Sequence, residues 1–451
     1  MSKTATVTQP EDYPQSSEAV RIGIIGSGPA GLALALALEH YTPKGSVEVT
    51  IMDRNASVAD YPGVEYGIQQ RACRALARIG VRERALQRGM RANEIRFYNA
   101  RLGKQFRSIQ SDPDNTRSVV RQEFLADMTA LLKTTTFQRS CMIEDCSPLG
   151  DGKVRTSGSI RAGGDFAFDY DLVVACDGGN STMRQKFFPI GSQRQDRGFS
   201  CIYMMVEIAE WSTASEDLLS LANAGRSEIV MGSICTLTLF PLGRNRLAFG
   251  IGFDHVTRRA IWAKLDLEES VDWPALTARQ KEAVARMLVQ DASHLGSAYE
   301  EALAHIQDWN SHKIYLWGMQ DTDALDCPFI QDVNVILIGD SAHAIMPTIG
   351  MGASLAIEDA EILGRRIADH LATVTSRAAF RGGLSQQVFA PFTAERVSVW
   401  KELIRRARLA AEQNFINVGA KKRFALGPQI PNDAISRFVS LGETVLRRLN
   451  L

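Results

Sequence analysis

Three glycines near the amino terminus have the spacing of a nucleotide-binding turn. Gly26, Gly28 and Gly31 follow a short apolar run, 22–25, and precede an Ala- and Leu-rich segment, 32–39. Ala and Leu favour helix, so the stretch predicts a strand, a tight turn and a helix, as this fingerprint requires. There the first glycine permits the turn, the second admits a pyrophosphate and the third lets the helix pack closely. The amides at the helix N-terminus would then face phosphate oxygens.

An acidic residue stands where a ribose-binding carboxylate is expected. A second strand-like stretch, 47–52, in which apolar and polar residues alternate at first, ends at Asp53, which lies 22 positions after Gly31. In dinucleotide-binding domains, an acid about 20 residues after the glycines hydrogen-bonds a ribose hydroxyl. These features predict a nucleotide site, and the alternative is a glycine turn that only packs a helix.

The composition is that of an ordinary globular protein. The 451 residues are 45% hydrophobic and 23% charged, with 51 basic and 51 acidic side chains. The length allows two or three domains, and the balanced charge gives no electrostatic reason to expect nucleic acid or an anionic membrane as partner. Seven cysteines without a C-x-x-C pair argue against a disulfide framework and a zinc cluster. No metal is expected.

Neither the start of the chain nor its first apolar stretch is predicted to be a targeting or membrane segment. Residues 1–19 are polar and lack the apolar core of a signal peptide, so they are predicted to be a disordered tail. The run 20–38 is hydrophobic enough to suggest a membrane span, but its three glycines and Pro29 favour a buried strand, turn and helix. A soluble, cytoplasmic protein is therefore expected.

Two later apolar runs also end in turns that carry an acid. The run 172–176 leads into Asp177-Gly178, and the run 333–338 leads into Gly339-Asp340. In open α/β sheets, ligands bind outside the carboxyl ends of the strands. Three such ends, spread over more than 300 residues, predict one long ligand held by a discontinuous domain.

The segment from about 191 to 318 has a different character. Stretches 199–208 and 246–253 are strand-like and rich in aromatics, and Pro241-Leu242-Gly243 marks a hairpin turn before the second of them. Helical patterns fill 257–309 and return in 386–413. An inserted, largely antiparallel sheet domain and a helical C-terminal region are predicted.

The three motifs in this order resemble those of the class A FAD-dependent aromatic monooxygenases, the family of para-hydroxybenzoate and salicylate hydroxylases. The second is YDLVVACDGGNSTMR, the third is VILIGDSAHAIMPTIGMGASLAIEDA, and the similarity runs from about 20 to 405. It implies an α/β fold: a discontinuous FAD-binding Rossmann-like domain, an inserted mixed or antiparallel β-sheet substrate domain and C-terminal helices. The expected divisions are a tail (1–19), the first FAD-binding part (20–190), the substrate domain (191–318), the second FAD-binding part (319–372) and C-terminal helices (373–451).

The resemblance also implies which residues hold FAD. Asp53 would bind the adenosine ribose, Arg121 the phosphate or ribose region, and Asp340 the ribityl chain. Backbone N–H groups of 350–353 would face the flavin pyrimidine, and Asp177 would serve FAD and nicotinamide handling. The expected cofactor-binding residues are Gly26, Gly28, Ala30, Gly31, Asp53, Arg54, Arg121, Asp177, Asp340, Gly350, Gly352 and Ala353.

Several positions remain open. Ser354 stands where the family usually has Asn, and Ala175 and Gln122 are less common at their positions. His343 is either a turn histidine satisfied by backbone or a motif member, and Arg184 either caps or pairs with Asp177. Two further structural expectations are that Asp359 caps or pairs and that 405–408 is a solvated helix face.

A few side chains are candidates for contact with the substrate. By resemblance, Pro347 should lie beside the flavin face where substrate binds. Tyr203, Arg246 and His255 are candidate polar contacts from the inserted sheet. Strand alternation places Arg246 and Ala248 on one face of that sheet and the residues between and after them on the other. The sequence leaves open which face meets the flavin.

By resemblance, FAD reduced by NAD(P)H reacts with O2 to form a C4a-hydroperoxide, whose distal oxygen passes to an aromatic or electron-rich small molecule. The expected result is hydroxylation or epoxidation. A second G-x-G-x-x-G domain is absent from the sequence, which fits a nicotinamide cofactor that binds only transiently. The chain is expected to be a monomer or homodimer.

Three alternatives share part of this pattern. A flavin-dependent halogenase would carry a W-x-W-x-I-P motif, and no two tryptophans here lie two apart. A non-enzymatic flavin-fold protein resembling the Rab-GDP dissociation inhibitors would keep only the first glycine turn. A plain NAD-dependent dehydrogenase would have no use for 339–359.

Overall fold

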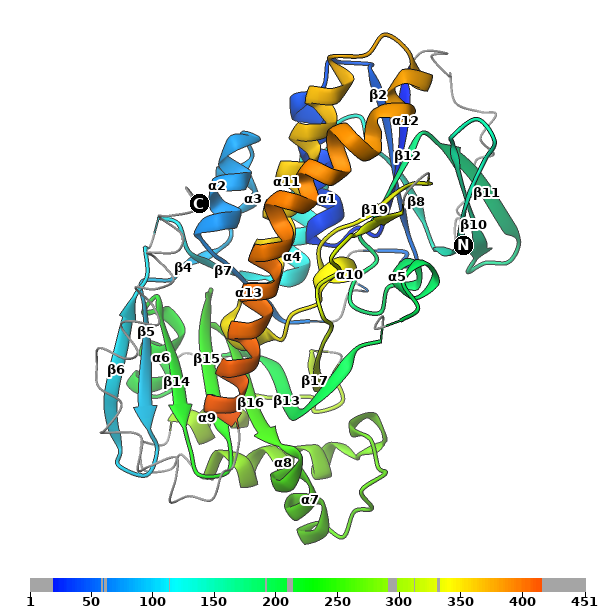
Figure 1. Cartoon of the computed structure of the whole chain (residues 1–451). Coiled ribbons are helices and arrows are strands. Elements are labelled where there is room, and N and C mark those ends of the chain that lie inside the picture. Colours follow the sequence, from blue (N-terminus) through cyan, green and yellow to red (C-terminus); the bar gives the residue numbers. More distant parts are fainter. Residues whose placement is uncertain are drawn as a thin grey trace, which may run out of the picture.

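The computed structural model describes residues 19–415 except 58, 59, 61, 62, 113, 191, 192, 209–213, 291–297, 312, 331 and 332. It has an α/β part and a second part built on a large sheet, and the long helix α13 (Ala390–Phe415) runs beside both (Figure 1). The tail predicted for 1–19 lies outside the described residues except for Ala19, as does 416–451 of the predicted C-terminal helices.

A six-stranded sheet forms the centre of the α/β part. The three apolar runs that precede the motifs are neighbouring parallel strands, since β12 pairs with β1 on one side and with β19 on the other. Their carboxyl ends therefore meet at one edge of the sheet, which confirms the predicted discontinuous domain. The order is β18 (Phe329–Ile330), β19 (Val333–Leu337), β12 (Leu172–Ala175), β1 (Val20–Ile25), β2 (Val47–Asp53) and β8 (Thr136–Arg139).

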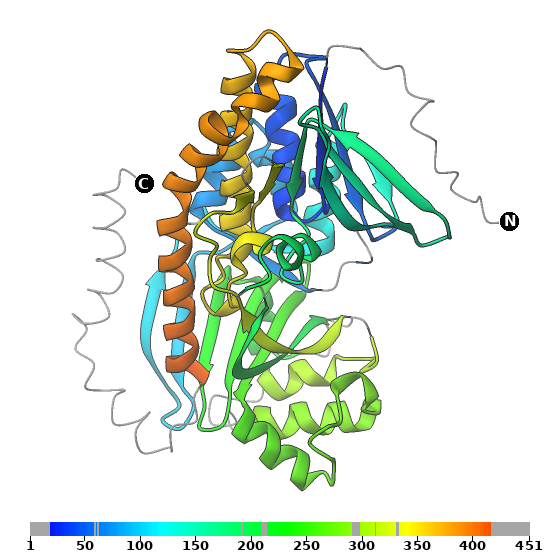
Figure 2. The ribbon, with the colours of Figure 1, turned by 45° about the vertical axis from the view of Figure 1, so that its right-hand side comes forward.

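Helices cover one face of this sheet, and a three-stranded meander packs on the other (Figure 2). Helix α1 is buried from Ala30 to Leu38. Helix α11 packs on α1 closely enough that a Cβ at Gly364 would lie 2.7 Å from that of Ala37. The helices are α1 (Pro29–Tyr41), α2 (Gln70–Arg78), α4 (Arg121–Leu131) and α11 (Gly352–Leu371); the meander is β9 (Cys141–Pro148), β10 (Val154–Ile160) and β11 (Asp165–Tyr170).

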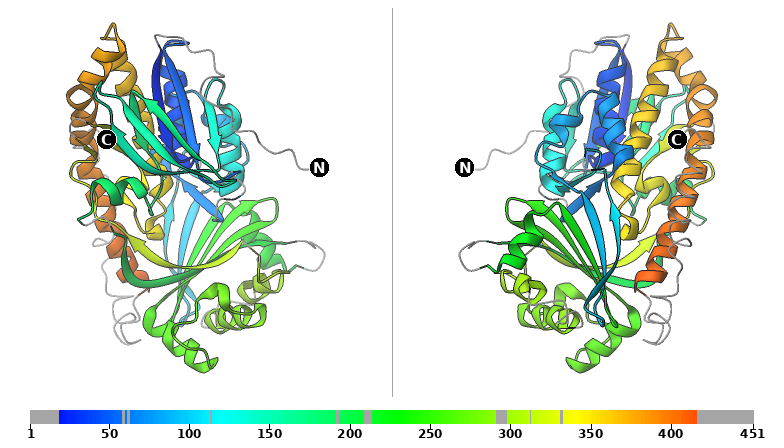
Figure 3. Two further views of the ribbon diagram at one scale, coloured as in Figure 1. Left: turned by 90° about the vertical axis from the view of Figure 1, so that its right-hand side faces the viewer. Right: turned by 90° about the vertical axis from the view of Figure 1, so that its left-hand side faces the viewer.

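A seven-stranded sheet forms the second part, with helices on its outer face (Figure 3). The predicted hairpin across 241–243 is confirmed as β15–β16. The sheet also takes β5 and β6 from the segment before 191, because β5 pairs in parallel with β14. Its order is β17 (Ile314–Asp321), β13 (Gln195–Glu207), β16 (Arg246–Asp254), β15 (Thr236–Gly243), β14 (Arg226–Met231), β5 (Glu94–Asn99) and β6 (Lys104–Gln110); the helices are α6 (Glu216–Asn223), α7 (His255–Lys264), α8 (Ala278–Val289) and α9 (Ala298–Ala304).

Short elements join the two parts. A small sheet carries the chain between them, and its strands are β3 (Glu65–Ile68), β7 (Arg117–Val120) and β4 (Met90–Arg91). The remaining helices are α3 (Arg82–Ala85), α5 (Thr182–Phe187), α10 (Asp340–His343) and α12 (Arg377–Gly383). None of the helices in the described part of the chain has both the length and the apolar character that a membrane crossing needs. The apolar stretch at 20–38 is a strand, a turn and a helix.

A buried ionic network fastens α13 to α11. Asp359 is fully buried and accepts hydrogen bonds from Arg396 Nε at 2.8 Å and Trp400 Nε1 at 3.0 Å. His343 Nε2 lies 2.6 Å from the other oxygen. Although burial alone would raise it, Arg396 and His343 hold the pKa of Asp359 below its usual value. The structural role predicted for Asp359 is confirmed, and His343 is bound by a carboxylate, not by backbone.

The stretch 405–408 only partly matches the predicted solvated face. Arg405 and Arg406 pair with Glu402 on their own helix. Arg408 instead reaches the buried carboxylate of Asp321 on β17, at 2.8 Å. The spacing of residues along a helix predicts an exposed stripe of arginines. It does not predict that Asp321, from a strand far away in the sequence, lies beside the last of these arginines.

Arg396→Ala should destabilise the apoprotein by about 3–5 kcal/mol, because it leaves buried Asp359 without its main cation. Arg405→Ala is the control on the same helix. Its pair with Glu402 is exposed, so a loss of at most about 1 kcal/mol is expected. Urea unfolding of both variants measures the difference. Equal losses would contradict the structural role of the Asp359 network.

Candidate active site

The glycine turn after β1 has the geometry that a pyrophosphate needs. Gly26 has φ of +102°, and a Cβ there would lie 2.5 Å from the carbonyl oxygen of Cys176. A Cβ at Gly31 would lie 2.0 Å from the carbonyl oxygen of Gly26. Helix α1 can therefore pack this close to the turn only because residue 31 is glycine. A Cβ at Gly28 would meet nothing within 4 Å. The turn is thus crowded on its protein side and open on its outer side, where a ligand can approach the amides.

Asp53 lies at the end of β2, beside this turn. Its carboxylate accepts hydrogen bonds from the Ser27 amide at 2.6 Å and the Ser27 hydroxyl at 2.7 Å. Arg139, at the end of β8, donates to the same hydroxyl at 2.7 Å. Asp53 therefore holds the glycine turn in place, and its predicted bond to ribose stays a prediction. Arg54 is exposed.

Asp340 has the properties of a ligand-facing carboxylate. It is exposed, yet it lies close to Arg121 and Arg194 from two other segments and to His343 at the far end of its own helix α10. Burial by the surrounding protein raises the pKa of Asp340, although these three side chains oppose the shift. A carboxylate that protein surrounds but leaves accessible lies at the wall of a recess. No other side chain among the described residues bonds to it, so a ribityl hydroxyl fits here.

The turn before α11 presents backbone amides. Leu355 makes the first intrahelical bond of this helix, to Met351 O at 2.8 Å. The amides of Gly352 and Ala353 precede that bond, and such amides point away from the helix toward a ligand. The Gly350 amide instead bonds Pro347 O at 2.9 Å. It is already used within the turn, which removes Gly350 from the predicted set of amide donors.

Ser354 has a structural use. Its hydroxyl accepts a hydrogen bond from the Gln69 amide at 2.9 Å and donates to Gly67 O at 3.2 Å. The Gln69 side chain bonds Gly350 O at 3.0 Å. Ser354, at the position where the family usually has Asn, therefore connects the β3–α2 segment to the start of α11. That helix start belongs to the turn that would hold the flavin pyrimidine.

Arg184 joins two of the motif turns, and Arg121 lies beside β3. Arg184 does not pair with Asp177. It donates to Ala342 O and Asp323 O, both at 2.6 Å. Asp177 accepts from the Ser181 hydroxyl at 2.6 Å, so it shapes its own turn. Arg121 begins α4 and lies 4.8 Å over the ring of Tyr66. Gln122, the uncommon neighbour, bonds Gly63 O at 3.0 Å.

One face of the large sheet meets the α/β part, and the other face is covered by helices. Ala248 packs with Val64 and Val120 from that part, whereas Leu247 and Phe249 pack against the helices on the opposite face. The inward side chains of β13 and β17 gather with the turn before α11 and with α13. This aromatic wall is defined as Phe199, Cys201, Tyr203, Tyr315, Trp317 and Met319, and the side chains opposite it are Ile345, Met346, Ile349, Ala407 and Ala411.

The three polar candidates for substrate contact lie in different places. Tyr203 lies within the aromatic wall, paired across the sheet with Gly250. Its hydroxyl donates to Glu65 Oε2 at 2.6 Å. Arg246 is four residues from Gly250 along β16, about 13 Å away. His255 lies beyond the other end of that strand, 3.8 Å from Asp196.

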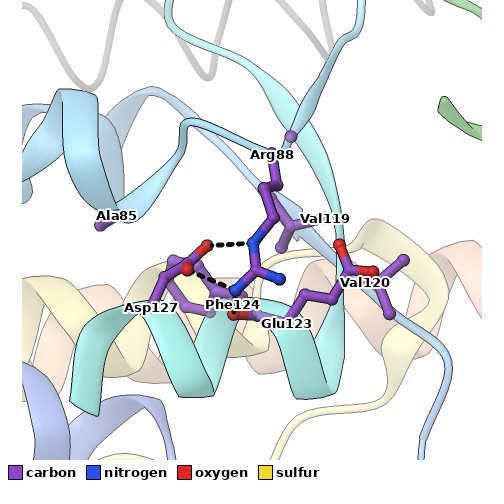
Figure 4. A pocket seen from close by; sticks show the side chains of 8 residues that line it. Ala85, Arg88, Val119, Val120, Glu123, Phe124 and Asp127 are labelled. Atoms are coloured by element: carbon purple, nitrogen blue, oxygen red, sulfur yellow. Dashed lines mark hydrogen bonds and ion pairs between the residues drawn. The ribbon is translucent and has the colours of Figure 1, made fainter. Parts of the chain in front are cut away.

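Arg246 has a partner that accounts for its charge. Its guanidinium lies 2.7 Å from Glu123, in the first turn of α4. Figure 4 shows Arg88, from the connection between α3 and β4, bonded to Asp127 on the same helix as Glu123. The Arg246–Glu123 pair fastens the large sheet to the α/β part, and the Arg88–Asp127 pair holds the α3–β4 connection against α4. Of the three candidates, the structure favours Tyr203, and contact of any of them with substrate stays a prediction.

Sequence reasoning missed Arg139, Arg194 and Glu65. Arg139 ends a four-residue strand with little apolar pattern. Arg194 approaches Asp340 from the connection between α5 and β13. Glu65 precedes Gly67 on β3, and only the lone acid within an otherwise uncharged stretch marks it in the sequence.

Asp340→Ala should weaken FAD binding by about 5- to 150-fold, since a buried ribityl hydroxyl would lose its partner at a cost of about 1–3 kcal/mol. The apoprotein should keep or gain thermal stability, because burial raises the pKa of Asp340 and disfavours its charged form in the fold. Calorimetric titration of deflavinated protein with FAD measures the first effect. Unchanged FAD affinity in a folded variant would show that Asp340 does not make this contact.

Comparisons with known proteins agree with this site. The chain is 26% identical over 365 residues to a salicylate hydroxylase of Pseudomonas putida, covering 78% of this chain and 77% of that protein. It is 21% identical over 351 residues to a FAD-dependent urate hydroxylase of Klebsiella pneumoniae, covering 76% and 79%.

Solved structures share the fold. HpxO of Klebsiella pneumoniae complexed with FAD and uric acid aligns with a TM-score of 0.69 at 17% identity, over 93% of this chain and 95% of that chain. A salicylate hydroxylase substrate complex aligns with a TM-score of 0.64 at 19% identity, over 91% and 94%.

The family follows from a match over most of the chain. The model described as FAD binding domain matches residues 19–379, which include all three motif turns and the whole of the large sheet. The open glycine turn, the accessible Asp340 and the amides at the start of α11 fit that cofactor. The chain therefore belongs to the FAD-binding family and, within it, to the FAD-dependent monooxygenases.

Proposed function

We propose that this protein uses NAD(P)H and O2 to hydroxylate or epoxidise an aromatic or electron-rich small molecule that binds between FAD and the seven-stranded sheet. The observation that carries the proposal is the aromatic wall. It stands on the sheet face that meets the α/β part, opposite the turn that begins at Pro347. Aromatic side chains of this kind bind flat apolar molecules by offset or edge contacts.

The residues of the wall suit a site that must exclude water. Tyr315 and Trp317 stack with ring centroids 5.0 Å apart, and Tyr203 lies 5.8 Å from Trp317. Helix α13 closes the same cluster with Ala407 and Ala411. Bound FAD, once reduced, supplies the activation of O2, and the chain's own groups keep the reaction dry and hold the substrate ring.

Hydrogen bonds hold the turn that begins at Pro347 in a fixed position. Its carbonyl accepts the Gly350 amide at 2.9 Å, so the ring is the part of Pro347 left to contact a ligand. The next residue, Thr348, donates to Ala407 O at 2.7 Å and ties the turn to α13. Pro347 itself is exposed. These contacts support its predicted place beside the flavin and the substrate.

A screen of aromatic compounds tests the proposal. Purified protein should be yellow, with FAD released on denaturation, and should oxidise NADH or NADPH slowly until a suitable aromatic is added. Phenols, indoles, quinolones and benzoates form the panel, followed by oxygen uptake and by mass spectrometry of the product. If none stimulates oxidation or gains an oxygen atom, the proposal fails. A chain that takes up no FAD would favour the non-enzymatic alternative.

Pro347→Gly should raise KM for the substrate and release more hydrogen peroxide per NAD(P)H, because glycine removes the rigid apolar ring from one wall of the site. FAD affinity should stay nearly unchanged. Pro43→Gly is the matched control, because Pro43 also accepts the amide three residues on, Ser46 N at 3.0 Å, in an exposed turn between α1 and β2. Wild-type KM and coupling in Pro347→Gly would refute this placement.

A further inference from the structure

A cavity lined mainly by charged and polar side chains lies where α3 meets β4 and β7 (Figure 1). Its volume is about 190 Å³, and its lining includes Arg82 and Glu83 from α3, Leu86 and Gln87 from the connection that follows, Arg91 from β4 and Arg117 from β7. Three of these six side chains are arginines. None of the six is among the residues assigned above to FAD or to the substrate.

Two of the three arginines face each other across a pair of strands. In the antiparallel pairing of β4 with β7, Arg91 lies directly opposite Arg117. Side chains opposite each other in such a pair lie close together on one face of the sheet, so like charges there are destabilising. The meander shows the favoured arrangement, because Arg155 on β10 lies directly opposite Asp169 on β11 and bonds it at 2.7 Å. At the cavity, the chain thus places two cations where the sheet favours opposite charges.

Arg117 carries the most deeply buried charge of the cavity. It is only 9% exposed, and its guanidinium donates to Thr116 O at 3.0 Å. Burial and the charges of Arg91 and Arg82 lower the pKa of Arg117. Asp114 opposes this shift by less than either arginine contributes to it. An anion within the cavity would offset both the loss of solvation and the repulsion between the arginines.

The acids near the cavity are exposed to solvent. Arg82 lies 3.6 Å from Glu83, whose side chain is exposed, and donates to the carbonyl oxygen of Asp114. The Asp114 carboxylate lies 3.2 Å from Arg91, and both of these side chains are mostly exposed. Asp112, which lies near Arg82, is exposed as well. Because water screens exposed pairs of this kind, they leave the buried end of the cavity positive.

The cavity lies on the face of the small sheet opposite the proposed substrate site. Successive side chains of a strand point to opposite faces. On β7, Ser118 bonds Glu65 and Val120 packs against the large sheet. Arg117 therefore points the other way, where a Cβ added to Gly89 of the α3–β4 connection would lie 3.3 Å from its own Cβ. A ligand in the cavity would be separated from the substrate by this sheet.

We propose that the cavity binds the phosphate group of a small molecule, held by the guanidinium groups of Arg82, Arg91 and Arg117. The planar guanidinium matches the geometry of phosphate oxygens, and a phosphate monoester brings about two negative charges to a group of three cations. A cavity of about 150 Å³ can hold benzene, so this one has room for a phosphate group and a few further atoms. The inference concerns a second ligand and does not depend on the proposed function.

Three variants remove one arginine each: Arg82→Gln, Arg91→Gln and Arg117→Gln. Each should weaken phosphate binding by about 10- to 150-fold, because a charge-assisted hydrogen bond is lost. Arg155→Gln is the matched control, since it removes an arginine from the same kind of strand pair and leaves the cavity unchanged. Arg82→Gln and Arg91→Gln keep the test decisive if the buried Arg117→Gln variant does not fold.

Calorimetric titration of the FAD-loaded protein measures the affinity, with inorganic phosphate as the first probe, glycerol phosphate as the second and chloride holding the ionic strength constant. Wild type and Arg155→Gln should bind one phosphate per chain with the same affinity, and each cavity variant should bind it more weakly by the stated factor. Malonate, which carries two carboxylates, should bind wild type more weakly than phosphate does. Absence of binding by wild type, equal binding by the cavity variants, or tighter binding of malonate overturns the proposal.

A charge reversal tests the electrostatic argument separately. Arg91→Glu places a carboxylate directly opposite Arg117, so it should abolish phosphate binding and give a higher Tm than Arg91→Gln in phosphate-free buffer. A lower Tm for Arg91→Glu than for Arg91→Gln, or retained phosphate binding, would show that the two arginines do not form a site for an anion.

The nicotinamide cofactors distinguish two sources of the phosphate group. If NADPH displaces inorganic phosphate and NADH does not, the ligand is the 2′-phosphate of the reductant. If neither displaces it, the ligand is a separate phosphorylated metabolite. A protein that hydroxylates an aromatic but binds no phosphate refutes this site alone, whereas phosphate binding by a protein that oxidises no NAD(P)H with any aromatic refutes only the proposed function.

Discussion

Parallel backbone pairing of β12 with β1 and β19 is the constraint on which the site depends. The register aligns Ile25 with Ala175 and Ala175 with Leu337, so the three strands end level. The chain must then turn in a crowded space, where a side chain at Gly26 or Gly31 would meet backbone within 2.5 Å. Three turns from distant parts of the chain therefore converge on one edge of the sheet, and a long cofactor can span them.

Hydrogen bonds from arginine side chains fix the positions of α13 and the large sheet relative to that edge. Apolar packing is non-directional and would permit α13 and the large sheet several orientations. Arg184 joins the Asp177 turn to the segment after Asp340, Arg396 joins α13 to α11, and Arg408 joins α13 to β17. The aromatic wall faces Pro347 because these directional contacts, together with the bond from Thr348 to Ala407 O of α13, fix the sheet, the turn and the helix relative to one another.

The sequence predicted what local pattern encodes. The uniform apolar runs and the turns after them identify β1, β12 and β19, and the hairpin signal at 241–243 identifies β15 and β16. The pairing of β5 with β14 could not be predicted in this way. The residues of a strand do not identify a partner strand that lies about 130 positions away in the chain. The same limit applies to Arg246 and Arg408, whose partners Glu123 and Asp321 are distant in the chain. Glu65 stands out in the sequence as a lone acid, but its bond to the Tyr203 hydroxyl, 138 positions away, could not be predicted.

A buried acid without a cation has a thermodynamic consequence of its own. The pKa of Glu65 is raised in the fold to about 7, whereas an unfolded glutamate has a pKa of about 4.3. The folded chain then holds this proton more tightly, so the contribution of Glu65 to stability is fully present below about pH 4 and is lost as pH rises through 7. An arginine opposite Glu65 would remove that loss, as arginine does for Asp359, but it would also keep the carboxylate ionised. The hydroxyl partners leave Glu65 able to take up a proton at neutral pH, at the one place where the aromatic wall meets the turn before α11.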